Sequence, residues 1–378
     1  MKIIHLSDLH LGKRVNGFSM LEDQRYILLE ILRIIDDTEP DAVIVAGDVY
    51  DKPVSPAEAV ELFDLFLTEL ASRRLAVFVI SGNHDSAERI AFGASIMNKS
   101  GVYMSRVYNG TVKPVKLGDR YGDVNFYLLP FIKPSYVKRF SGEENIQDYN
   151  DAVKAAVDSM NIDKSQRNVI VSHQFVTGAK TCMSEELSVG GLDNVDAGVY
   201  GIFDYAALGH IHGPQCILSN HIRYCGTPLK YSFSEIGHIK SVTVAELGKK
   251  GDVFINTVPL KPMRDMQEIK GTYMELTSRE FYRKLDTENY FHIILTDEND
   301  VTDAAAKLRV IYPNMMKISY DNTRTRAGTV RLRSEDAKRK EPLEILDEFY
   351  EFQNGRKMSG SQRRFAENLF EKLREENI

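Results

Sequence analysis

Side chains of the kind that bind metal ions follow several short apolar runs of this 378-residue sequence. They occur in the segments SDLH, AGDVYD, SGNHD, VSHQ and LGHIHG. Residues two apart in an extended chain point to the same side, so Asp8 with His10, and His210 with His212, can each direct two donors at one point. The set comprises two aspartates, one asparagine and four histidines: Asp8, His10, Asp48, Asn83, His173, His210 and His212.

This set has too many donors for one structural ion, and it suits two ions that keep open positions for water and substrate. Mixed imidazole and carboxylate ligation favours Mn, Fe or Zn over Ca or Mg. Two ions about 3.5–4 Å apart can polarise a phosphate and share an ionised water as the nucleophile. One carboxylate must then bridge the ions, and Asp48 is the natural candidate. A single segment of this kind is usually incidental, but burying several imidazoles and carboxylates together without a metal is costly.

Short, β-branched apolar runs that end in turn residues predict the strands that carry these side chains. The predicted strands are Ile3–Leu6, Ala42–Ala46, Ala76–Ile80, Val124–Leu129, Val169–Val171 and Tyr205–Leu208. Amphipathic helical patterns cover Met20–Asp36, 55–74 and Asp148–Met160, and Ser55 with Glu58 predicts a capping box at the start of the second. This alternation indicates an α/β sandwich with a largely buried sheet and a ligand crevice beyond the strand ends.

Glycines flank the donor segments, where tight turns or close backbone approach leave no room for a Cβ. They are Gly47, Gly82, Gly209 and Gly213. Later predicted strands, at 222–225, 241–245 and 253–258, come without long helices between them, which indicates a more antiparallel second half.

A change in composition after residue 259 marks a smaller second module. From Gly271 to Asp321 a strand–helix–strand–helix–strand pattern begins with GTYMELT as its first strand. A polar, basic stretch then leads to two amphipathic helices, PLEILDEFYEFQ and SQRRFAENLFEKLREE, which either pack on their own domain or dock on a partner. We therefore expect a main domain at 1–262, an α+β module at 263–325, and a linker with a helical segment at 326–378.

The composition excludes several classes of protein. No apolar run approaches the roughly 20 residues that a membrane span needs, and Asp8 and His10 interrupt the short apolar N-terminal stretch, so we expect no signal peptide. Three cysteines, Cys182, Cys216 and Cys225, predict no disulfide framework and fit a reducing cytoplasm. The net charge of −6 gives no overall sign of nucleic-acid binding, so any contact with a polyanion must be local or come from metal ions or a partner.

The order of the motifs DLH, GD, GNHD, H and GHIH resembles that of the calcineurin-like metallophosphoesterases. The resemblance implies a β-sandwich flanked by helices and two ligand sets that share one aspartate: Asp8, His10, Asp48 and His212 for one ion, and Asp48, Asn83, His173 and His210 for the other. It also implies that His84 is not a ligand. Instead, His84 acts beside the phosphate as general acid or transition-state stabiliser, with Asp85 orienting it.

Further segments resemble the SbcD family, the nuclease subunits of bacterial SbcCD complexes: HLGKRVNG, AGDVYDKPVSP, SGNHDSAER, YCGTPLKYSFSEIGH and PLKPMRDMQEIKG. This resemblance covers essentially the whole chain and thins after about residue 325. It implies a nuclease with Mn²⁺ as the favoured ion, which hydrolyses DNA in line with a two-metal-bridged hydroxide. The implied substrates are double-stranded ends for an exonuclease activity, and hairpins and single strands for an endonuclease activity.

The same resemblance implies a setting in DNA repair, recombination and replication. The module at 263–325 corresponds to a DNA-binding cap, and the C-terminal helices correspond to a segment that docks on SbcC, a coiled-coil ATPase. A homodimer within a heterotetramer is also implied, with a dimer face on helix Met20–Asp36 or on 87–97, although core packing explains both apolar stripes equally well. Position 51 is Asp, as in the bacterial branch of the family, whereas some archaeal and eukaryotic relatives carry His there, so the role of Asp51 stays open.

Three basic residues near the donor segments are candidates for contact with a DNA phosphate: Lys13, Arg14 and Arg89. The alternative is that Lys13 and Arg14 belong to a solvated loop and that Arg89 is a salt-bridge partner on a helix. Two other functions remain open for the whole chain. One is a phosphomonoesterase of the same fold, against which the extra module argues, and the other is a non-catalytic scaffold for the ATPase, against which the intact donor set argues.

Overall fold

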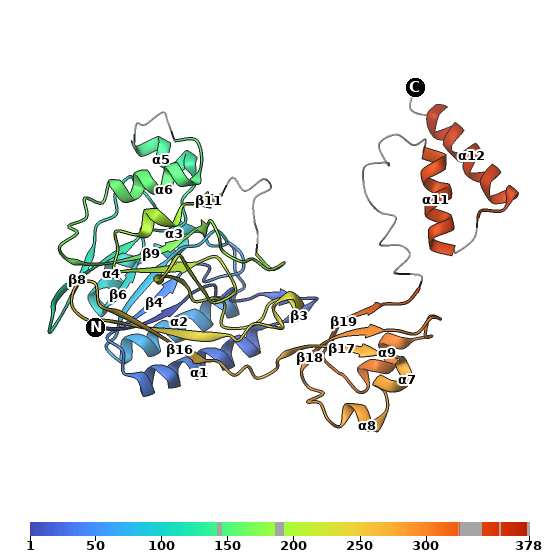
Figure 1. Cartoon of the computed structure of the whole chain (residues 1–378), viewed down its shortest axis with the longest axis horizontal. Helices are drawn as coiled ribbons and strands as arrows, with labels where there is room; N and C mark the ends of the chain where they lie inside the picture. Colours follow the sequence, from blue (N-terminus) through green and yellow to red (C-terminus); the bar gives the residue numbers. More distant parts are fainter. Residues whose placement is uncertain (142–145, 186–192, 324, 326–341, 355–356, 376–378) are drawn as a thin grey trace. The chain divides into compact units, whose positions relative to one another are not determined.

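The computed structural model describes the chain except for residues 142–145, 186–192, 324, 326–341, 355–356 and 376–378 (Figure 1). The chain divides into two units, Met1–Gln267 and Glu268–Ile378, each with its own core. No helix in the described part of the chain is long and apolar enough to cross a membrane. The predicted linker at 326–341 lies outside the described residues.

The first sheet of the larger unit has six strands in the order β16-β15-β1-β4-β5-β6. Their bounds are β1 (Lys2–Leu6), β4 (Ala42–Ala46), β5 (Ala76–Ile80), β6 (Val102–Met104), β15 (Ser241–Leu247) and β16 (Val253–Pro259). The strands β1, β4, β5 and β6 run parallel, whereas β15 and β16 are antiparallel to their neighbours. Every residue of β4 is buried, which explains why a continuous run of Ala, Val and Ile predicted this strand.

The second sheet also has six strands, in the order β13-β14-β12-β9-β8-β7. Their bounds are β7 (Val115–Asp119), β8 (Gly122–Leu128), β9 (Arg167–His173), β12 (Tyr205–Gly209), β13 (Gln215–Ile217) and β14 (Ser219–Tyr224). The expected, more antiparallel second half is correct for β15 and β16 and for the pair of β13 with β14, but the other neighbour of β14, β12, pairs with it in parallel. The reason is that β13 reverses the chain after β12, so that β14 starts again at the same edge as β12.

The two sheets pack face to face and form one shared core. Residues of the first sheet such as Ile44 and Phe78 lie in one buried cluster with Val169 and Phe126 of the second. The rings of Phe78 and Phe126 stack with centroids 4.2 Å apart. This β-sandwich confirms the predicted fold class, and it brings the strand ends of both sheets close enough to build one site.

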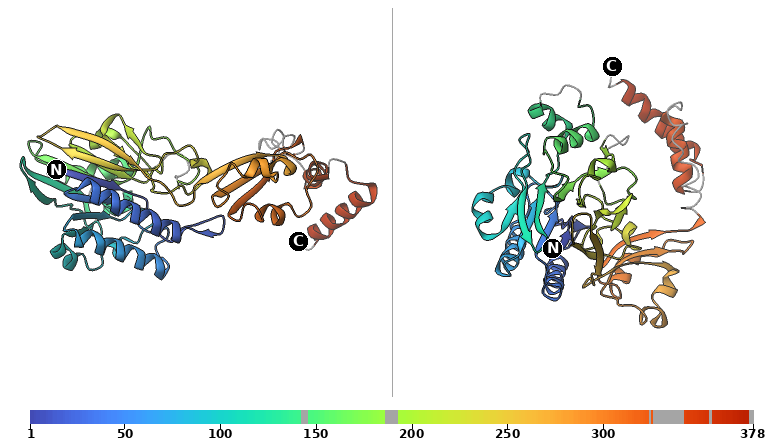
Figure 2. Two further views of the ribbon diagram at one scale, coloured as in Figure 1. Left: turned by 90° about the horizontal axis from the view of Figure 1, so that it is seen from below. Right: turned by 60° about the vertical axis from the view of Figure 1, so that its left-hand side comes forward.

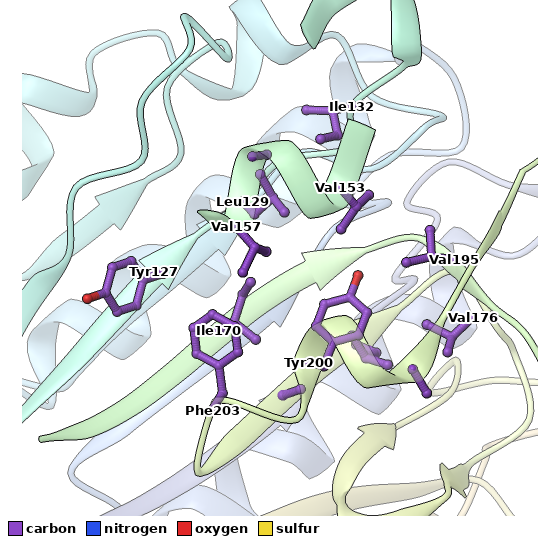
Figure 3. Close-up of a cluster of buried hydrophobic side chains, with 14 of the residues drawn as sticks. Tyr127, Leu129, Ile132, Val153, Val157, Ile170, Val176, Val195, Tyr200 and Phe203 are labelled. Atoms are coloured by element: carbon purple, nitrogen blue, oxygen red, sulfur yellow. The ribbon is translucent and has the colours of Figure 1, made fainter. Parts of the chain in front are cut away.

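Helices cover the outer faces of the sandwich (Figures 1 and 2). The helices α1 (Leu21–Thr38) and α2 (Ala57–Ser72) lie with the first sheet, and α5 (Pro134–Ser141) and α6 (Tyr149–Asp158) lie with the second. Two short helices, α3 (Ala87–Ile90) and α4 (Ala94–Met97), connect β5 to β6 along the chain. Figure 3 shows how Val153 and Val157 of α6 pack with Leu129 and Ile170. The predicted capping box of α2 does not form, because Pro56 holds the cap position. The Ser55 hydroxyl donates instead to the backbone O of Lys52.

Short elements complete the larger unit. They are β2 (Arg14–Val15), β3 (Phe18–Ser19), β10 (Phe175–Val176), β11 (Asn194–Val195) and the 3₁₀ turns η1 (Asn98–Ser100), η2 (Ala197–Tyr200) and η3 (Phe233–Glu235). The turn η3 places the buried side chain of Glu235 inside the unit.

The smaller unit is built on a three-stranded sheet in the order β17-β18-β19. Its elements are β17 (Met266–Gly271), α7 (Tyr273–Leu276), α8 (Arg279–Tyr282), β18 (Tyr290–Leu295), α9 (Ala304–Arg309) and β19 (Met315–Tyr320). The segment GTYMELT, expected as a strand, is mainly helix α7. A capping box between Thr272 and Glu275 starts this helix and ends the strand before it. Two helices follow, α11 (Pro342–Asn354) and α12 (Gly360–Glu375), as the sequence predicts.

Candidate metal centre

All seven predicted donor residues meet at one place in the larger unit, where the parallel strands of both sheets end. Asp8 and His10 follow β1, Asp48 follows β4, and Asn83 follows β5. The second sheet supplies the rest: His173 is the last residue of β9, and His210 and His212 follow β12. Ligand atoms of Asp8, His10 and His212 lie within 4.8 Å of one another, as do those of Asp8, Asp48 and His173.

Close contacts connect the donors within each predicted set. In the first set, Nε2 of His10 lies 3.3 Å from Nε2 of His212 and 3.8 Å from Oδ2 of Asp48. In the second set, Oδ1 of Asn83 lies 3.0 Å from Nε2 of His173 and 3.0 Å from Nδ1 of His210. Asp48 reaches the second set as well, because its Oδ2 is 3.2 Å from Nε2 of His173. Asp48 therefore lies between the two sets, where the sequence interpretation places a bridging carboxylate.

The backbone turns sharply at three of the donors. Asp8, His10 and Asp48 have φ angles of 52°, 45° and 48°, in the left-handed region that side chains other than glycine rarely adopt. The amide N of Asp8 donates to the backbone O of Gly47 at 3.0 Å, and the amide N of His10 donates to that of Asp48 at 2.9 Å. These bonds hold the loops after β1 and β4 together, so the strained backbone is fixed by its neighbours.

Two glycines allow the loops to approach one another. A Cβ on Gly209 would lie 1.9 Å from the backbone O of Ala46, which itself contacts Nδ1 of His173 at 2.8 Å. A Cβ on Gly82 would lie 2.1 Å from Oδ1 of Asp48. The expectation that close approach excludes a side chain is confirmed at both positions. Gly209 lets the second sheet approach the first, and Gly82 lets the loop after β5 approach the loop after β4.

Burial and mutual charge perturb the donors strongly. Burial raises the pKa of Asp8 to about 6. Burial opposes ionisation of Asp48 and His173 too, but each stabilises the charge of the other, so the pKa of Asp48 falls below its usual range and the pKa of His173 rises to about 9. Burial and the neighbouring His173 lower the pKa of His210 to about 3. Such perturbed groups in one cluster are typical of a functional site.

The donor chemistry fits a pair of divalent cations. Two carboxylates that are almost fully buried lie among imidazole rings, and Nδ1 of His10 is a buried nitrogen without a hydrogen-bond partner. The Nε2 atoms of His10 and His212 face each other, an arrangement that a cation between two lone pairs stabilises. Imidazole, carboxylate and amide oxygen together suit a first-row transition metal.

His84 lies at the edge of the donors with 16% of its side chain exposed. Its ring Nδ1 is 3.0 Å from the backbone O of Asp51, so Nδ1 carries the proton, and its Nε2 lies 4.0 Å from Oδ2 of Asp48. The resemblance implies that Asp85 orients His84 as a carboxylate–histidine pair, and this role stays a prediction. The carboxylate of Asp85 accepts from the backbone amides of Val49, Tyr50 and Gly82, which ties the loop after β4 to the loop after β5.

Asp51, whose role the sequence left open, supports two histidines at once. Its backbone O holds His84, while its Oδ1 lies 3.7 Å from Nδ1 of His10 and 2.5 Å from Nζ of Lys13. Lys13 therefore forms an ion pair with Asp51 beside the centre. Arg14 donates to the backbone O of Gly17 in the β2–β3 hairpin, and Arg89 is exposed on α3.

Sequence reasoning missed the residues that hold the outer side of His212. Ser184 and Glu185 come from the loop after β10, and Glu235 comes from η3. The segment SEIGH around Glu235 belongs to the motifs that resemble the SbcD family, but nothing in it indicates contact with His212. Ser184 has no recognisable motif, since its role depends on a contact with residues 28 and 51 positions away.

A family model of calcineurin-like phosphoesterases matches residues 1–214, which is more than half of the chain. The chain belongs to this family. A second model, described as the type 5 capsule protein repressor C-terminal domain and of the SbcD C-terminal type, matches residues 262–354. This SbcD-like metallophosphoesterase is therefore a phosphoester hydrolase by family, and its family uses a dinuclear metal site of the kind that the donors fit.

Three solved structures illustrate the breadth of similar folds. TT1561 of Thermus thermophilus has 11% identity and a TM-score of 0.39, over 68% of this chain and 98% of that one. A dimetal phosphatase from Danio rerio has 10% identity and a TM-score of 0.40, over 69% and 96%. An archaeal phosphodiesterase has 13% identity and a TM-score of 0.30, over 68% and 100%. None of them is similar enough to bear on substrate or mechanism.

Proposed function

We propose that this SbcD-like phosphoesterase is a Mn²⁺-dependent DNA nuclease that acts with an SbcC-type ATPase in processing DNA ends. Its substrates are double-stranded ends, hairpins and single strands. The observation that carries the proposal is the SbcD-type C-terminal domain at 262–354, which shares one chain with the candidate metal centre. A phosphomonoesterase of the same fold needs no such domain, and a scaffold needs no centre with all its donors.

The donors divide into two proposed ligand sets. Asp8, His10, Asp48 and His212 hold one ion, and Asp48, Asn83, His173 and His210 hold the other. When bound, two such ions supply Lewis-acid chemistry at a phosphate. The protein contributes fixed geometry, because the donors are placed by strand ends of two packed sheets rather than by a single loop.

His84 is the proposed catalytic residue that is not a ligand. The backbone O of Asp51 fixes the proton on Nδ1, so Nε2 is the nitrogen that faces the donors and a bound phosphodiester. For this role the ring must carry a proton on both nitrogens: the imidazolium donates Nε2–H to the leaving oxygen as general acid, or it stabilises negative charge in the transition state. Asp85 contributes indirectly, by holding the two loops on which Asp48 and His84 lie.

Cleavage of a hairpin DNA substrate with Mn²⁺ tests the proposal, with the wild type compared with His84→Ala. We expect cleavage to fall by about 10²–10⁴-fold while Mn²⁺ binding, measured by calorimetry, stays unchanged. His221→Ala, at a histidine on β14 outside the donor set, is the matched control and should cleave normally. Hydrolysis of nitrophenyl phosphate without cleavage of any DNA would replace the nuclease with the phosphomonoesterase alternative, and neither activity would favour the scaffold.

The smaller unit and the basic residues near the centre are the proposed DNA contacts. Between residues 268 and 323 the chain carries seven Lys and Arg against ten Asp and Glu. Contact of this cap with DNA is therefore local, at chosen basic side chains, and not a general attraction to phosphate. Lys13, which lies beside Asp51 and His10, is the phosphate candidate with the best-placed side chain, ahead of Arg14 and Arg89.

The C-terminal helices support docking on a partner ATPase. Phe349 of α11 and Phe365 and Leu369 of α12 are 57%, 71% and 49% exposed, although the two helices contact each other. Amphipathic helices that leave aromatic side chains uncovered are typical of partner-binding segments. Removing residues 336–378 should abolish association with the ATPase and leave metal-dependent cleavage intact, and unfolding of the remaining chain would contradict this assignment.

The proposed homodimer face lies on α3 and α4. The apolar stripe of α1 is core, because Ile27, Leu28 and Ile31 are buried. By contrast, Phe92 and Ile96 are 83% and 76% exposed, so core packing explains the buried Ile90 and Ala94 of 87–97 but not these two side chains. Two such copies, each with a docked ATPase, give the heterotetramer that the resemblance implies.

A further inference from the structure

The imidazole of His212 has two differently occupied sides. Its Nε2 faces the donors and lies 3.3 Å from Nε2 of His10. Its Nδ1 faces away from them and lies 2.9 Å from Oγ of Ser184. The backbone amide of His212 also donates to Oε1 of Glu185 at 2.9 Å, so the same loop holds both the ring and the main chain. The side chain is 97% buried, and this outer contact decides which nitrogen carries the proton.

The hydroxyl of Ser184 has one hydrogen, and its neighbours determine where that hydrogen goes. Oγ of Ser184 donates to Oε1 of Glu235 at 2.6 Å, because a carboxylate can only accept. Glu235 is paired as a carboxylate with the buried ammonium group of Lys240, whose Nζ lies 2.5 Å from Oε2. Ser184 must therefore accept from Nδ1–H of His212, and also from the thiol of Cys182, whose Sγ is 2.8 Å away.

A buried ammonium group anchors the carboxylate. Nζ of Lys240 donates to Oε2 of Glu235 at 2.5 Å, to Oγ1 of Thr227 at 2.7 Å and to the backbone O of His212 at 2.9 Å. All three donors of the ammonium group are thus used inside the protein. The pair Glu235–Lys240 fixes the carboxylate in place and bonds directly to the main chain of the residue that it orients.

The carboxylate of Glu235 is not available as a ligand of a further ion. Ligand atoms of Cys182, His212 and Glu235 lie within 4.8 Å of one another, which is close enough for a metal. However, Oε1 of Glu235 accepts from Ser184 and from the backbone amide of Tyr231, and Oε2 accepts from Lys240. Because each oxygen already faces donors, the cluster serves His212 and does not form a separate metal site.

We propose that Glu235 is a positioning residue of the metal centre: through Ser184 it holds His212 as the tautomer with the proton on Nδ1, so that Nε2 presents its lone pair to a divalent cation. This inference rests on the proposed assignment of His212 as a ligand. A carboxylate that acts through a hydroxyl on a metal-binding histidine raises the basicity of the ligand and fixes the ring orientation. Lys240 keeps the carboxylate charged and immobile.

The tautomer can be measured on metal-free full-length protein by long-range ¹H–¹⁵N NMR, with the His212 signal assigned from its absence in His212→Gln. The wild type should show His212 protonated at Nδ1. In Ser184→Ala, which leaves the buried Glu235–Lys240 pair intact, the Nδ1–H tautomer should lose its dominance. Protonation at Nε2 in the wild type, or an unchanged tautomer in Ser184→Ala, would overturn the proposal.

Calorimetric titration with Mn²⁺ tests the consequence for the centre. Ser184→Ala and Glu235→Gln should each weaken one of two binding events by about 10–100-fold. Ser184→Thr keeps a hydroxyl and should bind as the wild type does. Cys182→Ala removes another contact of the same hydroxyl and is the matched control, with affinity within about threefold of the wild type. Wild-type affinity in Ser184→Ala would contradict the inference. If the wild type bound no Mn²⁺, the proposed function would fail. The tautomer measurement would still decide whether Glu235 orients His212 through Ser184.

Discussion

Buried histidines occur in both units of this chain, and their surroundings differ. In the larger unit, four imidazoles converge with two buried carboxylates, and Nδ1 of His10 has no hydrogen-bond partner. In the smaller unit, Nδ1 of His292 lies 2.9 Å from Oε2 of Glu268, and its Nε2 lies 2.9 Å from Oγ of Ser319. Both nitrogens of His292 are satisfied by side chains on the neighbouring strands.

The comparison shows that burial of a histidine does not by itself indicate a site. Glu268, His292 and Ser319 lie on β17, β18 and β19 and satisfy one another's hydrogen-bonding groups. They link three neighbouring strands, so their role is structural. The cluster in the larger unit gathers side chains of the metal-ligand type from five chain segments, and some of their ligand atoms face each other. Such a cluster is unfavourable without a cation, so its energetic balance depends on something bound.

The largest expected effect is that of Asp48→Ala, which removes the carboxylate between the two donor sets. DNA cleavage should fall by about 10³-fold or more, equivalent to about 4 kcal/mol of lost transition-state stabilisation. Calorimetry should show at most one Mn²⁺ bound per chain. Equal activity in wild type and variant would refute the bridging assignment. The histidines of the larger unit would then be no more functional than His292 in the smaller unit.

A smaller effect is expected from Gly209→Ala, because the new Cβ meets the backbone O of Ala46 and displaces Nδ1 of His173. Overpacking of this kind should lower the free energy of unfolding by about 3 kcal/mol. Urea denaturation measures the loss. Gly237→Ala, at a glycine with no heavy atom within 4 Å of the added Cβ, is the matched control and should be nearly neutral.

His5 offers a third kind of buried histidine, outside both clusters, with Nδ1 2.8 Å from the hydroxyl of Tyr205. Burial and the charge of Arg223 lower the pKa of His5 from 6.5 to about 3. As pH falls below 6.5 the unfolded chain takes up the proton first, so stability present above pH 6.5 is lost progressively towards pH 3. Between pH 7.5 and 5.5 this group should remove about 1.4 kcal/mol.

Urea denaturation at the two pH values, on the wild type and on His5→Gln, isolates this contribution of His5. The variant lacks the titrating group, so its stability should fall less than that of the wild type by about the same 1.4 kcal/mol. If both proteins lost equal stability on acidification, His5 would not be held neutral in the fold.

The smallest expected effect is that of His292→Gln in the smaller unit. An amide can keep only part of the bonding with Glu268 and Ser319, so the variant should lose about 1 kcal/mol of stability. Mn²⁺ binding and cleavage at the donors of the larger unit should not change. A loss of Mn²⁺ affinity in His292→Gln would show that His292 contributes to metal binding and is not purely structural.

Much of the larger unit could be predicted from local sequence. The strands at Ala42–Ala46 and Ala76–Ile80 match their predicted bounds, because a strand buried on both faces has an unbroken run of apolar residues. The convergence of the donors followed from the same reasoning, since parallel strands end at one edge. The parallel direction of β14 was missed because β13 is only three residues long and gives almost no signal.

Other features depend on contacts that sequence patterns do not record. Thr272 and Glu275 did carry a visible capping box, but the alternating apolar residues of GTYMELT favoured a strand. The family resemblance implies a pair between Asp85 and His84, but it gives no sign that the carboxylate of Asp85 also accepts from three backbone amides. Ser184 and Glu235 are 51 residues apart, and only the packed fold brings them to His212.

The left-handed backbone of Asp8, His10 and Asp48 has a consequence for the evolution and engineering of this protein. Each such residue costs the fold about 1–3 kcal/mol, and glycine at the same position would relieve most of that strain. Thermostability and hydrolysis therefore pull in opposite directions at these three positions. A library screened for heat resistance alone would accumulate replacements there and return well-folded, inert proteins.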